Sequence, residues 1–283
     1  MIESVGIVGA GTMGNGIAQV CATAGLTVVM VDISDAAVER GLSTLGTSLE
    51  RLVKKEKMTA ADRQAALARI TATTDRGKLA GSDLVIEAAT ENEPIKIGIL
   101  KSLCELLAPE TLLATNTSSI SITKLAAVTD RPDRFIGLHF FNPVPVMELM
   151  EVIRGLKTSD ETHEKALVFA RRIGKQAITA RNNPGFAVNR ILCPMINEAI
   201  FALGEGIASA EEIDAGMKLG CNHPIGPLAL ADLIGLDTLL SIMEVFYQGF
   251  NDSKYRPAPL LKEMVDAGQL GRKSGQGFFS YRK

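Results

Sequence analysis

The sequence has few of the features that mark secreted, membrane-spanning or nucleic-acid-binding proteins. Its four cysteines are scattered, without the CxxC spacing or the companion histidines of a metal site or the density of a disulfide framework. No apolar run approaches the roughly 18 residues of a membrane span. A formal net charge of −2 and a pI near 6.0 leave no basic surface for nucleic acid. The sequence therefore predicts no metal, no membrane and no nucleic-acid partner.

Length and composition narrow the class further. The chain has 283 residues, of which 46% are hydrophobic and 22% are charged, and this is typical of a globular protein with one or two domains. The first expected strand begins by about Val5, which leaves no room for a signal or transit peptide. We therefore expect a cytoplasmic protein.

The most informative motif lies near the N-terminus. An apolar strand at residues 5–8 is followed by Gly9-Ala10-Gly11-Thr12-Met13-Gly14 and a helix, and the next apolar run ends on Asp32. Gly9 permits the tight turn, Gly11 lets the backbone approach a pyrophosphate, and Gly14 lets the helix lie close to its strand. Asp32 can accept hydrogen bonds from ribose hydroxyls and would repel a 2′-phosphate. A turn without a ligand is the alternative, but strand, helix and acidic residue in this order predict an NAD site.

The remaining pattern predicts two domains. Alternating strand and helix signals over residues 1–183 indicate an α/β fold, a Rossmann-type doubly wound parallel sheet. The long connection from Ser34 to Arg69 reads as an inserted helical hairpin, with Ser34 and Thr59 as helix caps. Strand signals stop at Asn183-Pro184, so residues 184–283 are expected to form an all-α domain. Strands are expected at 4–9, 27–32, near 70–73, and at 84–89, 112–115, 135–140, 148–153 and 176–181.

The second domain is expected to begin with a helix from Pro184 to about Leu203. This helix is apolar nearly all round, so it needs cover on every side. A short helical domain offers little cover, which favours a homodimer formed through this domain over simple packing on the first domain.

Polar residues follow the expected strands where a parallel sheet binds ligands. Glu91 follows one strand, the run from Asn116 to Ser119 follows the next, and His139 ends a third. Each has an ordinary structural alternative, such as a helix cap, a solvated carboxylate or a core histidine. A carboxylate on the next strand can pair with the histidine as an acid–base dyad, but periodicity does not separate Glu151 from Glu148.

Four longer motifs carry a family resemblance. They are Asn116-Thr117-Ser118-Ser119, His139-Phe140-Phe141-Asn142-Pro143-Val144-Pro145, Pro184-Gly185-Phe186-Ala187-Val188-Asn189-Arg190 and His223-Pro224-Ile225-Gly226-Pro227. Together with the ending Gly271-Arg272-Lys273-Ser274-Gly275-Gln276-Gly277-Phe278, they resemble the 3-hydroxyacyl-CoA dehydrogenase family over essentially the whole chain. The chain looks most like the short bacterial members without a fused hydratase. The resemblance implies NAD-dependent interconversion of short-chain 3-hydroxyacyl-CoA, such as 3-hydroxybutyryl-CoA, and 3-ketoacyl-CoA such as acetoacetyl-CoA.

The resemblance also implies roles for individual residues. His139 would be the acid–base residue, with Glu151 rather than Glu148 as its carboxylate, and Ser118 and Asn189 would hydrogen-bond the substrate. Asn189 would lie about one and a half turns into the first C-terminal helix, and the active site would be a cleft between the domains. The cofactor positions implied are Gly9, Gly11, Thr12, Met13, Gly14, Asp32, Glu91, Lys96, Ser118, Asn142 and Lys273.

For the acyl-CoA substrate, the resemblance points to Ser48 and Lys55 in the helical hairpin. The residues agree, because Arg51, Lys54 and Lys57 lie close to Lys55 and phosphates need local cations. The alternative is a solvated basic helix face.

Two other functions stay open at this point. A dehydrogenase of free β-hydroxy acids would share the cofactor site, although such enzymes more often use a lysine as the acid–base residue. A non-catalytic NAD-binding structural protein would share the fold but would not need to keep a catalytic dyad.

Overall fold

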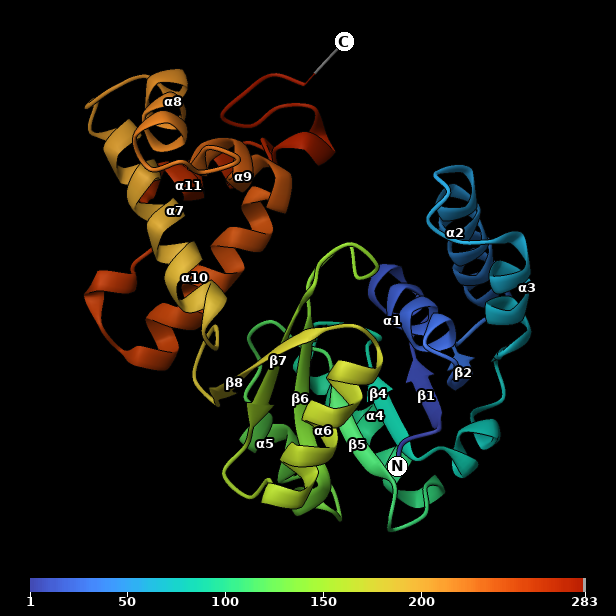
Figure 1. The fold of residues 1–283 in the computed structure, drawn as a ribbon. Coiled ribbons are helices and arrows are strands. Elements are labelled where there is room, and N and C mark those ends of the chain that lie inside the picture. The colour runs from blue at the N-terminus through green and yellow to red at the C-terminus, as the bar shows by residue number, and fades with distance from the viewer. Residues whose placement is uncertain (282–283) are drawn as a thin grey trace. The chain divides into compact units, whose positions relative to one another are not determined.

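The computed structural model describes residues 1–281 and divides them into two compact units, Met1–Asn183 and the residues from Pro184 onward (Figure 1). The first unit contains a sheet flanked by helices, and the described part of the second is built from helices and the segments that connect them. Within residues 1–281, no helix is long and apolar enough to cross a membrane.

An eight-stranded sheet forms the centre of the first unit. Its strand order is β3-β2-β1-β4-β5-β6-β7-β8. The central strands are apolar because both faces are covered; all four residues of β4 are buried, for example. The strands are β1 Ser4–Val8, β2 Thr27–Val31, β3 Ile70–Thr73, β4 Leu84–Glu87, β5 Leu112–Thr115, β6 Phe135–Phe140, β7 Leu149–Arg154 and β8 Gln176–Arg181.

One pairing departs from the expected parallel sheet. β7 runs antiparallel to β6, whereas the other neighbouring strands are parallel. The predicted doubly wound sheet is present, but this one pair is antiparallel rather than parallel, because residues 141–148 form a turn with no crossover helix and a short turn reverses the chain. The reversal places His139 directly opposite Glu151.

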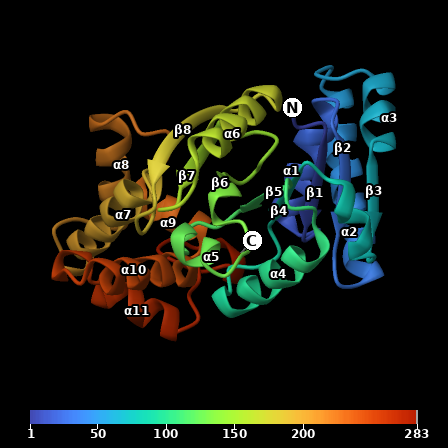
Figure 2. The ribbon, with the colours of Figure 1, turned by 90° about the horizontal axis from the view of Figure 1, so that it is seen from below.

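Helices cover both faces of the sheet. α1 and α6 contribute to one core cluster, and α4 and α5 lie on the opposite face from α6 (Figure 2). α2 and α3 are the expected hairpin, and both views show them side by side at the β3 edge of the sheet. Ser34 and Thr59 cap them as predicted. The helices are α1 Thr12–Thr23, α2 Asp35–Lys54, α3 Ala60–Ala68, α4 Glu93–Leu106, α5 Ile122–Ala126 and α6 Asp160–Arg172, with 3-10 turns η1 Arg76–Gly81 and η2 Pro132–Arg134.

The second unit packs its helices around α7. Ile196 and Ile200 of α7 are fully buried with Leu239 and Met243 of α10 in a core of their own. Asp214 of α8 accepts hydrogen bonds from the first amides of α9, which satisfies that helix start. The elements are α7 Val188–Gly204, α8 Ala210–Gly220, α9 Pro227–Ile234, α10 Leu236–Phe250 and α11 Pro259–Asp266, with η3 Ser253–Tyr255 and η4 Arg272–Ser274.

The start of α7 differs from the expectation. The helix begins at Val188 rather than Pro184, because Gly185 and Phe186 adopt positive φ values of 76° and 52°. The prediction that Pro184 starts the helix was therefore wrong, and Asn189 lies in the first turn instead of one and a half turns along.

Candidate active site

In the glycine turn between β1 and α1, two of the three glycines are closely packed and the third faces open space. Gly9 has a φ of +107°, and a Cβ on Gly14 would lie 1.7 Å from the Gly9 carbonyl oxygen. A Cβ on Gly11 would meet no atom within 4 Å. The turn itself therefore requires glycine at positions 9 and 14. The open space at Gly11 is where a ligand can approach the backbone.

The N-terminus of α1 fits a phosphate group. Ser34, Thr59, Asn92, Ser121 and Ser159 each cap a helix of the first unit through a side-chain oxygen. The N-cap of α1 is Gly11, which has no side chain to cap the helix, so the first amides of α1 and the helix dipole face the turn. Asp32 Oδ2 accepts a hydrogen bond from Ala10 N at 2.7 Å, which holds the carboxylate against the same turn. These residues fit the pyrophosphate and ribose of a dinucleotide.

A buried histidine–carboxylate pair lies at the ends of β6 and β7. His139 Nδ1 is 2.6 Å from Glu151 Oε2. Glu151 is fully buried and His139 is 5% exposed, with its ring 4.5 Å from that of Phe141. Glu148, the rival carboxylate, is exposed. Strand register therefore brings Glu151 to the histidine, and the pair has the geometry of an oriented acid–base residue.

The loop after β5 is held by a carboxylate from the loop after β4. Glu91 Oε1 accepts hydrogen bonds from Thr117 Oγ1 at 2.7 Å, from Ser118 N at 2.8 Å and from Ser119 Oγ at 3.3 Å. Glu91 was predicted to meet the cofactor. In this structure it fixes the backbone around Ser118.

Lys96 supports the same region from inside the fold. Its side chain is fully buried, and Nζ lies 2.6 Å from Glu87 Oε2, 3.3 Å from Thr115 Oγ1 and 3.2 Å from the Asn116 carbonyl oxygen. The resemblance assigned Lys96 to the cofactor. Its ammonium group joins the carboxyl ends of β4 and β5, and its role at the cofactor stays a prediction.

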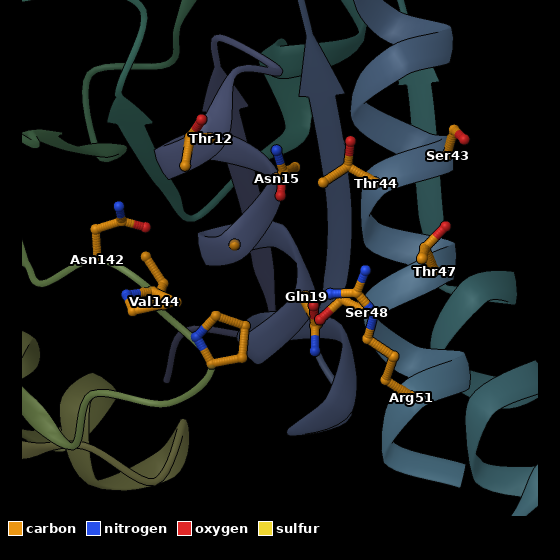
Figure 3. Close-up of a pocket in the computed structure, with 13 residues that line it drawn as sticks. Thr12, Asn15, Gln19, Ser43, Thr44, Thr47, Ser48, Arg51, Asn142 and Val144 are labelled. Carbon is orange, nitrogen blue, oxygen red and sulfur yellow. The ribbon is translucent and has the colours of Figure 1, made fainter. Parts of the chain in front are cut away.

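A pocket of about 380 Å³ lies beside the glycine turn, between α1, α2 and the turn at residues 142–145. Figure 3 shows Thr44, Ser48 and Arg51 along the side of α2 that faces this pocket, with Asn142 and Val144 across from them. Thr12, Asn15, Gly16 and Gln19 line the pocket from α1. Lys55, the residue that follows α2, is exposed and does not line the pocket.

Comparison with known proteins agrees with this geometry. Residues 4–183 match the family model for the NAD binding domain of 3-hydroxyacyl-CoA dehydrogenase, and residues 185–281 match that for its C-terminal domain. The chain belongs to the 3-hydroxyacyl-CoA dehydrogenase family. It is 54% identical to a 3-hydroxybutyryl-CoA dehydrogenase of Bradyrhizobium diazoefficiens, over 100% of this chain and 96% of that protein. It is 51% identical to a probable 3-hydroxybutyryl-CoA dehydrogenase of Bacillus subtilis, over 100% and 98%.

A solved structure extends the comparison to three dimensions. The crystal structure of (S)-3-hydroxybutyryl-CoA dehydrogenase from Ralstonia eutropha has a TM-score of 0.98 and 65% identity, and the match covers 100% of both chains. Membership of the 3-hydroxyacyl-CoA dehydrogenase family confirms the fold class, the NAD cofactor and the NAD-dependent dehydrogenase activity predicted from the sequence.

Two of the residues that the family resemblance singled out lie in the second unit. Asn189 is in the first turn of α7, and Lys273 is in η4. Lys273 Nζ forms an ion pair with Asp237 Oδ1 of α10. Burial acts to raise the pKa of Asp237, but the hydrogen bond and charge of Lys273, together with hydrogen bonds from backbone N–H groups, outweigh it and hold that pKa below its ordinary value.

Sequence reasoning missed two buried groups that hold this site together. Lys175 is 7% exposed, and its Nζ donates to the carbonyl oxygens of Val144 and Met147, both at 2.6 Å. It thereby fixes the turn that follows His139, and burial lowers the pKa of its ammonium group. Glu87, the partner of Lys96, was missed as well. Nothing local in the sequence marks either group, because buried lysines and glutamates are rare and are recognised only by their partners.

Proposed function

We propose that the protein interconverts 3-hydroxybutyryl-CoA and acetoacetyl-CoA, with NAD as the hydride carrier. The observation that carries the proposal is the buried His139–Glu151 pair, which lies on the same sheet as a glycine turn fitted to a dinucleotide. Full-length relatives named for this substrate, at 51–65% identity, support the acyl group.

In this proposal His139 moves the proton while hydride passes between C3 of the substrate and the bound nicotinamide. During oxidation, Nε2 takes the proton of the 3-hydroxyl group; during reduction, the protonated ring returns it to the new alkoxide. Glu151 accepts the Nδ1 hydrogen bond, so it fixes the tautomer with Nε2 as the base and stabilises the imidazolium that forms. A carboxylate that is fully buried beside the ring makes this pairing strong.

Two polar side chains are proposed to bind the substrate near C3. Ser118 and Asn189 would donate hydrogen bonds to the oxygen that gains charge. Ser118 is suited to this role because Glu91 holds its backbone. Asn142 and Lys273 stay predictions as cofactor residues.

The coenzyme A part of the substrate is proposed to bind along α2. Ser48 and Arg51 line the pocket, and Lys54, Lys55 and Lys57 follow at the end of the helix. Hydroxyl groups and cations at this spacing can meet the phosphates of coenzyme A. The pocket is close to the glycine turn, since Thr12 and Asn15 line it too.

We also propose that the protein is a homodimer formed through the second unit. The support is α7, whose apolar residues run nearly all round the helix, with Leu192, Met195 and Phe201 only partly buried in its own core. Light scattering of the purified protein tests this: a dimer mass supports the proposal and a monomer mass overturns it. The cytoplasmic location stays a prediction.

One substitution tests the assignment of His139. We expect His139→Gln to bind NADH with unchanged affinity, measured by fluorescence titration, while kcat for acetoacetyl-CoA reduction falls roughly 10²- to 10⁴-fold. His163→Gln is the matched control, because His163 lies on α6 and its ring contacts Thr179 Oγ1 at 2.8 Å, on a different element from His139. Activity that survives in His139→Gln would overturn the acid–base role.

The two alternative functions are separated in the same assays. A dehydrogenase of free β-hydroxy acids would reduce acetoacetate as fast as acetoacetyl-CoA, whereas the proposal expects a strong preference for the thioester. A structural NAD-binding protein would bind NADH without turnover of either compound.

A further inference from the structure

The strand that carries His139 extends past its neighbour on one side. β6 pairs with β5 only as far as Gly137, which lies opposite Thr115, the last residue of β5. β6 continues to Phe140, so His139 and Phe140 have a strand partner only on the β7 side, at Glu151 and Met150. Phe140 is 2% exposed, and a buried backbone N–H without an acceptor is costly.

The side chain of Asn116 supplies the hydrogen-bond acceptor that β5 does not provide at Phe140. Its Oδ1 accepts the hydrogen bond from Phe140 N at 3.0 Å. That N–H belongs to the peptide unit that joins His139 to Phe140, so the contact restrains the backbone next to the imidazole. Asn116 is the first residue of the Asn-Thr-Ser-Ser motif, and no role had been assigned to it.

The backbone of Asn116 is fixed on two other sides. Its N–H donates to the Glu87 carbonyl oxygen at 2.7 Å, and its own carbonyl oxygen accepts from Lys96 Nζ at 3.2 Å. Lys96 is locked in turn by its ion pair with Glu87. One residue therefore connects the ends of β4, β5 and β6, and its side chain projects from a backbone that has little freedom to move.

We propose that Asn116 is a positioning residue that sets His139 relative to Ser118. Ser118 lies two residues further along the same loop, where Glu91 holds its N–H. His139 lies on β6 and Ser118 lies in the loop after β5, and the Asn116–Phe140 hydrogen bond joins that loop to β6. The inference rests on the proposed acid–base role of His139, because Asn116 acts only through the placement of that ring.

The test compares variants at the two ends of β5. Asn116→Ala removes the acceptor for Phe140 N. We expect kcat for acetoacetyl-CoA reduction to fall roughly 10- to 100-fold, because a displacement of about 1 Å at a catalytic group can cause such a loss. The Kd for NADH and the KM for acetoacetyl-CoA should stay within about twofold of the unsubstituted protein. Asn116→Asp keeps an acceptor oxygen at the same place and should recover most of kcat. Thr111→Val is the matched control: it removes the buried Thr111 Oγ1 bond to the Ser82 carbonyl oxygen, 3.0 Å long, just before β5 begins. It should lower thermal stability without lowering kcat.

A double variant separates positioning from general loss of structure. In the His139→Gln background, Asn116→Ala should lower the residual kcat less than about twofold, because the group that it positions is already gone. A full additional 10- to 100-fold loss there would overturn the inference, and so would an Asn116→Asp variant as slow as Asn116→Ala. If Asn116→Ala does not fold, Asn116→Ser serves instead, since its shorter side chain also withdraws the acceptor.

The same series distinguishes failure of this inference from failure of the proposed function. Active His139→Gln would remove the acid–base role and the inference with it. A collapse of activity in His139→Gln together with normal kcat in Asn116→Ala would overturn the inference alone.

Discussion

The first unit contains two buried pairs, a lysine with a carboxylate and a histidine with a carboxylate, and the two pairs differ in the chemistry that they can perform. The Glu87–Lys96 and His139–Glu151 pairs both have an N–O separation of 2.6 Å, and both carboxylates are fully buried. Lys96 also binds two further oxygens, from Thr115 and Asn116, so all three of its donors are used. The imidazole of His139 has a second ring nitrogen, Nε2, besides the one that contacts Glu151. Distance and burial alone therefore do not distinguish a structural pair from a chemical one.

The partner chemistry decides the difference. Lys96, with three acceptors, holds the loops after β4 and β5 in one arrangement, and we call Glu87–Lys96 the architectural pair because this role is structural. A histidine whose Nδ1 is fixed by a carboxylate can exchange a proton at Nε2. We therefore expect the Glu87–Lys96 pair to control the stability of the fold and the His139–Glu151 pair to control the rate of the reaction.

Breaking the architectural pair should give the largest effect. Lys96→Met leaves the Glu87 carboxylate buried without its cation, and we expect a loss of about 3–5 kcal/mol in the free energy of unfolding, measured by urea denaturation. The double variant Glu87→Gln with Lys96→Met removes the uncompensated charge and should recover part of this loss. A double variant no more stable than Lys96→Met would contradict the role of the ion pair.

Breaking the chemical pair should act on rate more than on stability. Glu151→Gln keeps the shape of the side chain but removes its charge, so the tautomer and the imidazolium of His139 lose their support. We expect kcat to fall roughly 100-fold, about 2.7 kcal/mol in the barrier, with an unchanged Kd for NADH. Glu148→Gln is the control, because Glu148 is exposed and precedes the same strand. Equal losses of kcat in Glu151→Gln and Glu148→Gln would contradict the specific role of the His139–Glu151 pair in the reaction.

Most of the fold could be predicted because its signals are local. Apolar runs located all eight strands, and Ser34 and Thr59 marked two helix starts correctly. The direction of β7 was not predicted, since it depends on what residues 141–148 do rather than on the strand itself. The start of α7 was also missed, because positive φ at Phe186 is unusual for an aromatic residue and leaves no mark in the sequence.

The candidate site was predictable only in part, for a related reason. Strand ends pointed to His139 and Ser118, but periodicity could not choose between Glu148 and Glu151 until the register of β6 and β7 was known. The sequence gives no sign that Lys96 and Lys175 are both buried and bonded to loop backbone. Such supporting contacts arise from tertiary structure, so no local pattern reveals them.

The smallest effect is expected at Asp83, an exposed carboxylate just before β4, at the opposite end of the sheet from the two buried pairs. Partial burial by itself raises the pKa of Asp83, but hydrogen bonds from Glu3 N, Ser4 N and Ser4 Oγ outweigh it and hold the pKa below its ordinary value. The unfolded chain therefore binds more protons than the folded one as pH falls, so the stabilisation is present above the ordinary pKa and is lost below the folded pKa.

Asp83→Asn should thus lower the free energy of unfolding by roughly a few tenths of a kcal/mol at pH 7, after allowance for solvent screening, and by less at pH 3. Urea titrations of both proteins at the two pH values measure the difference, and kcat at pH 7 should match that of the unsubstituted protein. A stability gap that widened toward pH 3 would mean that the hydrogen bonds do not favour the ionised carboxylate. A reduced kcat would mean that a charge at the amino ends of the strands influences the reaction. That result would contradict the assignment of rate control to the His139–Glu151 pair.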